Sequence, residues 1–544
     1  MKEKFGMKEF VSVRLFSGVF AAFAFAASSY ATDWVFDYSN ERNVQWSAAL
    51  GTSESPGYWY DSANPSNYIM GSYSETDSFL VGDESGENTI FIYLDSDVTI
   101  GSLTLTGKDY NNSARVQSSG DYTYSLTVLG DVVRAESAQM AFLDRLNVLT
   151  IGGNLLLGRN NIQMGDKKVN ILGDIISNSP TGVRGNVYAQ PGITTASKTF
   201  EEGLADPDMI VGGILRNGEG GAPLSMYSKA DSSRDTYIRV GGASGNVDIK
   251  REAPGSISAV ADTVSYFIFA NSQDYSSTGN MSENNNYWLS QHGKLAIVMN
   301  GTASQEFTGN SLCFQGGVKV LSGSLKLAFN QNGNNYSHYR DSGRTISVTY
   351  MTQEGGSTRT TYSHGDLEIS GGEFSSSSNA GYGAFRFTNI KYSGGTIALR
   401  LDGATSMDSI DLTTYYGRVA DSSSGEEVVT WETFAGGTVT RMEGAGKITF
   451  NFTGDLVWLV DYESEGKQGV KIISWDALPQ ELSADDFTAN RYSSSGDDYM
   501  AQFALYDDGL YVYYTAVPEP AELAVLFGAI ALGVAAWRRR KAGR

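Results

Sequence analysis

Short β-branched segments that end in glycine recur early in the chain: Leu103-Thr-Leu-Thr-Gly107, Leu126-Thr-Val-Leu-Gly130-Asp131, Leu149-Thr-Ile-Gly152-Gly153-Asn154 and Val169-Asn-Ile-Leu-Gly173-Asp174. They are spaced by about 23, 22 and 21 residues, a length typical of one solenoid coil. Each coil can bury an alternating apolar face against the next, and glycine can turn the corner with a positive φ. The pattern therefore predicts stacked β-coils with these final glycines along one edge.

Composition also favours a long stack of short strands. The 544 residues include 62 glycines and 10 prolines, and Cys313 is the single cysteine, so no intramolecular disulfide can staple the chain. The net charge of −21 argues against nucleic acid as a partner, because phosphate binding needs a basic face. Divalent cations, cationic surface polymers and a merely solvated acidic surface remain open.

The N-terminus has the features of an export signal. Lys2, Lys4, Lys8 and Arg14 precede an apolar stretch over residues 15–27, and small residues occupy the signal-peptidase positions of Ser29-Tyr30-Ala31. We expect residues 1–31 to be a signal peptide that is cleaved between Ala31 and Thr32. An uncleaved anchor is the weaker alternative, because the apolar stretch is too short to span a bilayer comfortably.

The C-terminus carries three features in a fixed order: a proline box, a short apolar run over residues 523–537 and a basic cluster. About fifteen helical residues span only ~22 Å, less than the ~30 Å hydrocarbon core, although Trp537 suits the interface and the basic residues favour the cytoplasmic side. We expect a sorting segment over residues 516–544 with a transmembrane helix over 521–537. Its parts are Val517, Pro518, Glu519 and Pro520, followed by Arg538, Arg539, Arg540 and Lys541 as a stop-transfer cluster.

This tail resembles the PEP-CTERM sorting signal of Gram-negative bacteria. The resemblance implies cleavage near the Pro-Glu-Pro box by a membrane protease of the exosortase type, followed by release or attachment at the cell surface. It also implies transient residence in the inner membrane. The alternative is a plain single-pass anchor that happens to follow a Pro-Glu-Pro turn.

A second resemblance lies in the interior. Phe307-Thr308-Gly309 and the segment Gly316-Gly-Val-Lys-Val320-Leu-Ser-Gly323-Ser-Leu-Lys-Leu327 look like the autotransporter-associated β-strand repeat. The opening, with Trp46, Asp77 and Phe79, resembles the first coil of PEP-CTERM proteins that carry such repeats. The resemblance implies an all-β fold, a right-handed parallel β-helix, without the membrane barrel of a true autotransporter.

The expected organisation has three parts between the terminal signals. An aromatic N-terminal cap covers residues 32–85, the β-helix with degenerate repeats covers 86–403, and longer alternating strands over 404–515 form a C-terminal β cap. The aromatic residues of the N-terminal part could also stack on sugar rings.

No strong catalytic or metal-binding motif is present. His292, His338 and His364 lack zinc-site spacing, and a catalytic thiol would need a base near Cys313. Adjacent acids could serve glycoside hydrolysis, but they lie beside turn residues and are more simply turn formers: Asp485-Asp486, Asp497-Asp498 and Asp507-Asp508. We expect no cofactor and no enzyme activity.

Two functions remain. The first is an exported, exosortase-processed protein of the cell surface or extracellular matrix with an adhesive or structural role, for which extracellular polysaccharide is a candidate partner. The second is a β-helix polysaccharide lyase or glycoside hydrolase that reaches the surface by the same route. A groove with convergent Asp, Arg and Lys would favour the enzyme.

Overall fold

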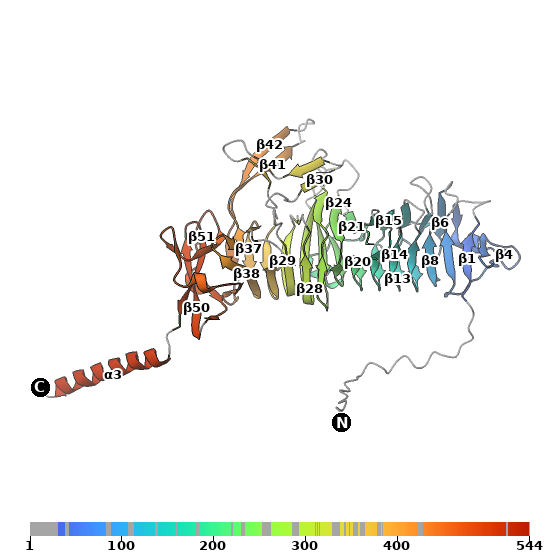
Figure 1. Cartoon of the computed structure of the whole chain (residues 1–544). Coiled ribbons are helices and arrows are strands. Elements are labelled where there is room, and N and C mark those ends of the chain that lie inside the picture. Colours follow the sequence, from blue (N-terminus) through green and yellow to red (C-terminus); the bar gives the residue numbers. More distant parts are fainter. Residues whose placement is uncertain are drawn as a thin grey trace, which may run out of the picture.

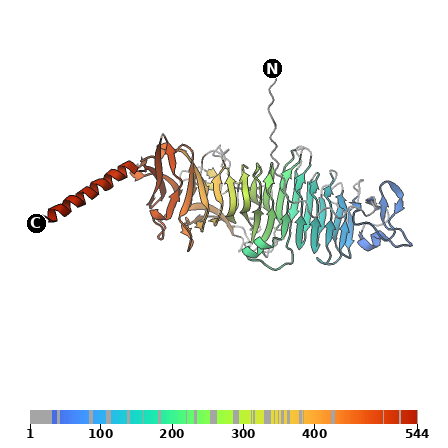
Figure 2. The ribbon, with the colours of Figure 1, turned by 90° about the horizontal axis from the view of Figure 1, so that it is seen from below.

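The computed structural model describes residues 31–542 apart from the gaps 38–42, 83–88, 107–113, 136–139, 159, 180–183, 219–220, 230–233, 253–262, 285–292, 310–311, 313, 315, 329–337, 342–343, 348, 352–356, 360–364, 378–381, 383, 422–427, 495 and 518–519. The chain forms a long stack of parallel β-coils (Figures 1 and 2). The predictions for residues 1–30, Gly107, Cys313, His292 and His364 lie outside the described residues.

Each coil has three sides, and three parallel ladders run along the stack. The first face contains β2 (Asn43–Gln45), β6 (Ile90–Leu94), β9 (Ala114–Ser118), β12 (Met140–Asp144), β15 (Asn160–Gly165), β18 (Gly185–Ala189), β21 (Leu224–Lys229), β24 (Val247–Glu252) and β27 (Met281–Asn284).

The second face begins with β7 (Val98–Ile100), β10 (Leu126–Val128), β13 (Val148–Ile151), β16 (Lys168–Ile171), β19 (Met209–Val211), β22 (Thr236–Val240) and β25 (Thr263–Phe269). The third begins with β1 (Asp33–Phe36), β5 (Ser78–Val81), β8 (Ser102–Leu105), β11 (Val132–Arg134), β14 (Leu155–Leu157), β17 (Ile175–Ser177), β20 (Leu215–Asn217), β23 (Ala243–Ser244) and β26 (Tyr275–Ser277).

Two long strands join the second and third faces without a break. The first part of β28 (Gly293–Phe307) pairs with β25 and its last part with β26, and β29 (Gly317–Leu327) follows β28 along both parts. Gly323 has φ +72° between the two parts of β29, and a Cβ there would lie 2.6 Å from the Ala303 carbonyl oxygen. Glycine is therefore required at this bend.

The coil continues to the C-terminal end of the stack. The second face goes on through β34 (Leu367–Ile369), β37 (Ile390–Tyr392) and β43 (Val439–Arg441), and the third through β35 (Glu373–Ser376), β38 (Thr396–Gly403), β44 (Ile448–Thr453) and β48 (Phe487–Ala489). The expected boundary at residue 403 is therefore wrong as the end of the coil. Parallel pairing across it is favourable because β44 offers the same alternating apolar face as β38.

An antiparallel hairpin covers the last coil. β36 (Ala384–Arg386), β40 (Ser409–Asp411) and β47 (Val470–Ser474) pair in parallel, and β51 (Gly509–Ala516), β50 (Asp497–Tyr506) and β49 (Tyr492–Ser494) extend this sheet in antiparallel fashion. The structure confirms the turn expected at Asp507-Asp508, which joins β50 to β51 at Gly509, and none of these residues has a positive φ. Between β44 and β47, Val457–Leu459 forms a 3-10 turn, η2.

The N-terminal end is closed by aromatic packing. β3 (Trp59–Asp61) and β4 (Asn64–Tyr68) pair antiparallel beside β1, and α1 (Trp46–Leu50) lies next to them. Trp46, Trp59 and Phe79 are buried, with ring centroids 4.9–5.6 Å apart. Their burial favours the cap interpretation over a sugar-stacking surface, because the rings cover the open edge of the stack.

Smaller elements decorate the coil. The hairpin of β41 (Tyr415–Asp421) and β42 (Val428–Phe434) projects from one side near β30, as Figure 1 shows. The others are β30 (His338–Asp341), β31 (Arg344–Ser347), β32 (Thr349–Met351), β33 (Ser357–Arg359), β39 (Ser406–Met407), β45 (Glu463–Ser464), β46 (Lys467–Gln468), α2 (Phe200–Ala205), η3 (Ala484–Asp486) and α3 (Pro520–Ala542).

The repeat register differs in detail from the predicted one. Leu126, Leu149 and Val169 do stack on the second face, but Leu103 lies on the third, and the partner of Leu126 is Val98. Backbone hydrogen bonds of 2.6–3.0 Å link a column of glycines at one corner: Gly101, Gly130, Gly153, Gly173, Gly213 and Gly241. Gly153 thus takes the place expected for Gly152, because it follows Leu149 by about the same four residues that separate Gly130 from Leu126 and Gly173 from Val169.

Candidate functional site

Strained turns stack where the chain passes from the first face to the second. Tyr122 has φ 58°, Arg145 φ 59° and Thr194 φ 62°, although none of them is glycine. The Tyr122 amide donates to the Arg145 carbonyl at 3.1 Å, and the Arg145 amide donates to the Gly165 carbonyl at 2.8 Å. Such backbone conformations cost free energy and concentrate at functional positions, so this corner is a candidate site.

The turns line an open hollow of about 380 Å³, which we call the corner hollow. Its lining is almost entirely polar, with one aliphatic side chain, Ile193. The lining residues come from successive coils: Tyr122, Asp144, Arg145, Gln163, Gly165, Gln190 and Ile193. A cavity of this size lies within the range of ligand sites, roughly 300–1,000 Å³.

Two acids lie at this corner, Asp166 fully buried and Asp144 half-buried. Burial raises the pKa of Asp144, while Arg115 and Arg145 oppose the shift. Burial also holds the pKa of Asp166 well above its usual range, and Asp144 adds to that shift. Asp144 Oδ1 and Asp166 Oδ2 have no hydrogen-bond partner among the described residues, whereas Asp166 Oδ1 accepts from the Leu146 amide at 2.8 Å. Both shifts are toward the neutral form of a carboxyl, which can donate as well as accept a hydrogen bond.

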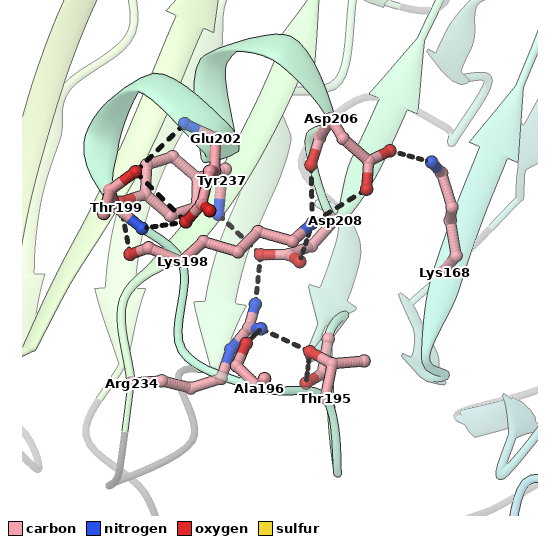
Figure 3. Close-up of polar contacts among 11 residues, drawn as sticks. Lys168, Thr195, Ala196, Lys198, Thr199, Glu202, Asp206, Asp208, Arg234 and Tyr237 are labelled. Atoms are coloured by element: carbon pink, nitrogen blue, oxygen red, sulfur yellow. Dashed lines mark hydrogen bonds and ion pairs between the residues drawn. The ribbon is translucent and has the colours of Figure 1, made fainter.

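Beside the hollow lies a network of ion pairs (Figure 3). Asp208 is fully buried and pairs with Arg234, also buried, and with Lys198 Nζ at 3.1 Å. The Tyr237 amide donates to Asp208 Oδ2 at 3.0 Å. Lys198 and Lys168 both contact the more exposed Asp206, which follows α2 in the chain.

This network fastens α2 to the second face of the stack. Thr199 and Glu202 form a capping box at the start of α2, and Phe200 packs on Tyr266, which stacks on Tyr237 at 5.0 Å. A Cβ at Gly203 would lie 2.4 Å from the Tyr237 ring, so glycine permits this close approach. Convergent Asp, Arg and Lys do occur here, but they neutralise one another, so the network is best explained as structural.

The network and the hollow adjoin through one loop. A Cβ at Gly192 would lie 2.3 Å from an Arg234 nitrogen and 2.9 Å from Asp208 Cγ. The next residue in the chain, Ile193, lines the hollow. The buried pair therefore supports the loop that forms one wall of the hollow.

The expected signal-cleavage position lies at the start of the first coil. Ala31 is exposed, whereas the Thr32 amide donates to Asp77 Oδ1 at 2.9 Å and the Thr32 carbonyl accepts from the Ser78 amide at 2.9 Å. Cleavage itself stays a prediction.

The expected sorting motif lies just after the C-terminal hairpin. The Val517 amide donates to the Asp498 carbonyl at 2.7 Å, Pro518 and Glu519 lie outside the described residues, and α3 begins at Pro520. Arg538, Arg539, Arg540 and Lys541 are exposed near the end of α3, with Lys541 Nζ 4.7 Å from the Trp537 ring centroid. Figures 1 and 2 show α3 projecting away from the stack.

The transmembrane helix expected over residues 521–537 needs correction. A helix does form over this segment, but no helix among the described residues is long and apolar enough to cross a membrane. The uncharged run of about fifteen residues extends only ~22 Å along the helix axis, which is less than the ~30 Å thickness of the hydrocarbon core. The basic cluster follows this run directly.

The other candidate groups do not come together. Asp485 and Asp486 lie in η3, Asp497 and Asp498 begin β50, and Asp507 and Asp508 form the turn between β50 and β51. His338 lies in β30. Within the described part of the chain, no three His, Cys, Asp or Glu residues could share a metal ion.

Sequence reasoning missed the corner hollow. Tyr122, Arg145 and Gln190 lie between the predicted strands, and their spacing follows no motif. One signal was present, because charged or polar residues directly follow strands of the first face in consecutive coils, as in Asp144-Arg145 and Asp166-Lys167.

The sequence matches no family model, and no curated protein matches it.

Proposed function

We propose that this protein is exported, processed at both ends, and displayed at the surface or in the extracellular matrix of a Gram-negative-type bacterium, where it has an adhesive or structural role. The observation that carries the proposal is the parallel stack from β5 to β48, closed by an aromatic cluster at one end and a hairpin at the other. Such a stack supplies length and repeated surface, which adhesion and matrix building both need.

The terminal segments support the proposed route. The Ala31-Thr32 junction follows a signal-like sequence, and the Val517 to Pro520 box with its basic cluster resembles the PEP-CTERM signal. Signal peptidase and an exosortase-type protease are the partners that this resemblance implies. That the coil is right-handed stays a prediction. Its physical basis is that connections between parallel strands of one sheet are almost always right-handed.

A variant of the box tests the route. Replacing Pro518 and Pro520 by Ala should cause an uncleaved precursor to accumulate in the membrane fraction, because the extended box no longer presents the cleavage segment. Pulse-chase labelling followed by mass spectrometry of the C-terminus would measure this. The matched control is Pro479→Ala, which should mature normally. Maturation of the double variant at the control rate would refute the proposed role of the box.

The second candidate function is a polysaccharide lyase or glycoside hydrolase. The corner hollow favours it, since burial raises the pKa of both Asp144 and Asp166, as general acids require. We nevertheless expect no turnover when the full-length chain is incubated with acidic and neutral polysaccharides and assayed for reducing ends and unsaturated products. Turnover that Asp144→Asn abolishes would establish the enzyme instead.

A further inference from the structure

We propose that the corner hollow is a binding subsite for a neutral, hydroxyl-rich saccharide. The assignment rests on the proposed adhesive function, which it deepens by naming the class of ligand. Gln163, Gln190, Tyr122 and Asp144 place amide, phenol and carboxyl groups around one cavity of about 380 Å³. The two amides and the phenol each donate and accept hydrogen bonds and the carboxyl accepts them, which matches the paired donor and acceptor character of sugar hydroxyls.

The lining argues against other classes of ligand. Ile193 is its one aliphatic residue, so an apolar ligand would leave the surrounding polar groups unpaired. The described residues offer no group of three metal ligands at the hollow. The nearby carboxyl of Asp121 disfavours a polyanionic chain, and Arg145 is the one basic residue of the lining.

Backbone strain and an unpaired buried oxygen at the hollow both favour a bound ligand. Tyr122 and Arg145 hold positive φ values in consecutive coils, and Asp144 Oδ1 is buried without a hydrogen-bond partner among the described residues. An unpaired buried oxygen is costly, and a ligand hydroxyl would satisfy it. Strain and an unpaired acceptor are independent observations, and both point to this corner.

Binding of defined oligosaccharides to the purified full-length protein tests the proposal. Maltohexaose, cellohexaose and mannohexaose are the neutral probes, and oligogalacturonate is the acidic comparison. Tyr122→Asn removes the ring but tolerates a positive φ, and Gln163→Ala removes one amide. Each should weaken binding of the neutral probe by about tenfold or more in calorimetric titration. The control Asn170→Ala, on the neighbouring face of the stack, should bind as the natural protein does.

Three outcomes would overturn the assignment: no neutral probe binds, both variants bind as tightly as the control, or oligogalacturonate binds best. Thermal melting of each variant verifies that it is folded. Because purified protein is used, failure here would not bear on export and processing, which the box variant tests separately.

A different observation carries a second inference. We infer that cleavage after Ala31 creates an ion pair between the new Thr32 ammonium and Asp77, and that this pair fastens the N-terminal cap. Water adds across the Ala31-Thr32 peptide bond under signal peptidase, with OH going to the Ala31 carbonyl carbon and a proton to the Thr32 nitrogen. The free amine then takes a further proton from solvent, so a neutral N–H donor becomes a cation.

The acceptor is already in place. Asp77 is buried, its Oδ1 lies 2.9 Å from Thr32 N, and its Oδ2 accepts from Trp34 Nε1 and from the Ser74 amide at 2.9 Å each. Among the described residues, the charged side chains nearest this position in sequence and strand pairing are acidic: Asp33, Asp61, Glu75 and Asp77. They favour the protonated amine and so raise its pKa above the ordinary ~7.7–8.0.

The test compares Thr32–Arg544 carrying a free amine with the same chain acetylated at Thr32. Acetylation should lower the melting temperature by several degrees at pH 6, because it removes the cation but keeps the N–H donor. The difference should disappear at high pH, since stability from a raised amine pKa is lost as pH rises through it. In an Asp77→Asn background, acetylation should have no effect.

Equal melting of the two chains at pH 6, or an equal effect of acetylation in both backgrounds, would overturn the ion pair. If Asp77→Asn does not fold, the pH dependence of the acetylation effect decides by itself. The chain that begins at Thr32 can be made without export, so the result is independent of the proposed processing route.

Discussion

Gly153 shows how strongly single residues constrain this stack. A Cβ at this position would lie 2.2 Å from Asp131 Oδ1 and 2.7 Å from the Gly130 carbonyl carbon. The Gly153 amide also donates to the Gly130 carbonyl at 2.8 Å, so two coils approach each other through their backbones. No side chain can be accommodated there unless the coils separate.

We therefore predict that Gly153→Ala lowers the free energy of unfolding by roughly 1–3 kcal/mol, the usual cost of overpacking. The control is Gly446→Ala, because a Cβ at Gly446 meets no atom within 4 Å. Urea denaturation followed by circular dichroism would measure both variants. Equal midpoints for the two would contradict the close approach of the coils.

At the scale of elements, the carboxylate of Asp508 stabilises the C-terminal hairpin. Asp508 lies between β50 and β51, and its two oxygens contact Lys467 Nζ and Lys471 Nζ at 2.6 Å each, while the Tyr511 hydroxyl donates to Oδ2 at 3.0 Å. Partial burial opposes ionisation, but the hydrogen bonds from Lys467, Lys471 and Tyr511 outweigh it and hold the pKa of Asp508 well below its usual range.

The sign of the pH dependence follows from this lowered pKa. Asp508 contributes stability above the ordinary Asp pKa of ~3.9, and this contribution is lost as pH falls toward the folded-state value. We predict that Asp508→Asn destabilises the protein by at most about 1 kcal/mol at pH 7, since the site is partly exposed. The difference in melting temperature should shrink below about pH 4.

Asp507→Asn is the matched control for this prediction, because Asp507 occupies the same turn. It should melt within a degree or so of the natural protein across the same pH range, as surface substitutions usually do. A pH-independent loss of stability in Asp508→Asn would show that the side chain acts through the shape of the turn and not through its charge.

For the whole molecule, the stack behaves as one coil repeated many times. Leu149 lies in register with Val169 and Leu155 with Ile175, so residues 149–168 make up one complete coil. The strand ladders join each coil to its two neighbours, so its stability comes mainly from its own packing and from two interfaces.

We predict that deleting residues 149–168 leaves a folded, β-rich protein shortened by one strand spacing, about 4.8 Å. Deleting residues 149–158 should instead cause misfolding or aggregation, because every later strand would move to the wrong face. Circular dichroism, thermal melting and small-angle scattering would distinguish the two variants. Equal folding of both would contradict the three-sided register.

The sequence by itself determined the class of fold. Glycine-terminated β-branched segments at coil-length intervals can bury their apolar faces only by stacking, and this local rule needs no knowledge of distant contacts. For the same reason the strand around Leu126 was predictable, while the phase error at Leu103 arose because insertions of varying length interrupt the repeat.

The tertiary structure alone decided which residues meet at the corners. Tyr122, Arg145, Gln163 and Gln190 come from successive coils, and Asp208, which follows the insertion that contains α2, pairs with Arg234 one coil later. Their separation in sequence depends on loop lengths that carry no periodic signal. Only the stacking of the coils fixes these residues in register, and the hollow and the ion-pair network arise from that register.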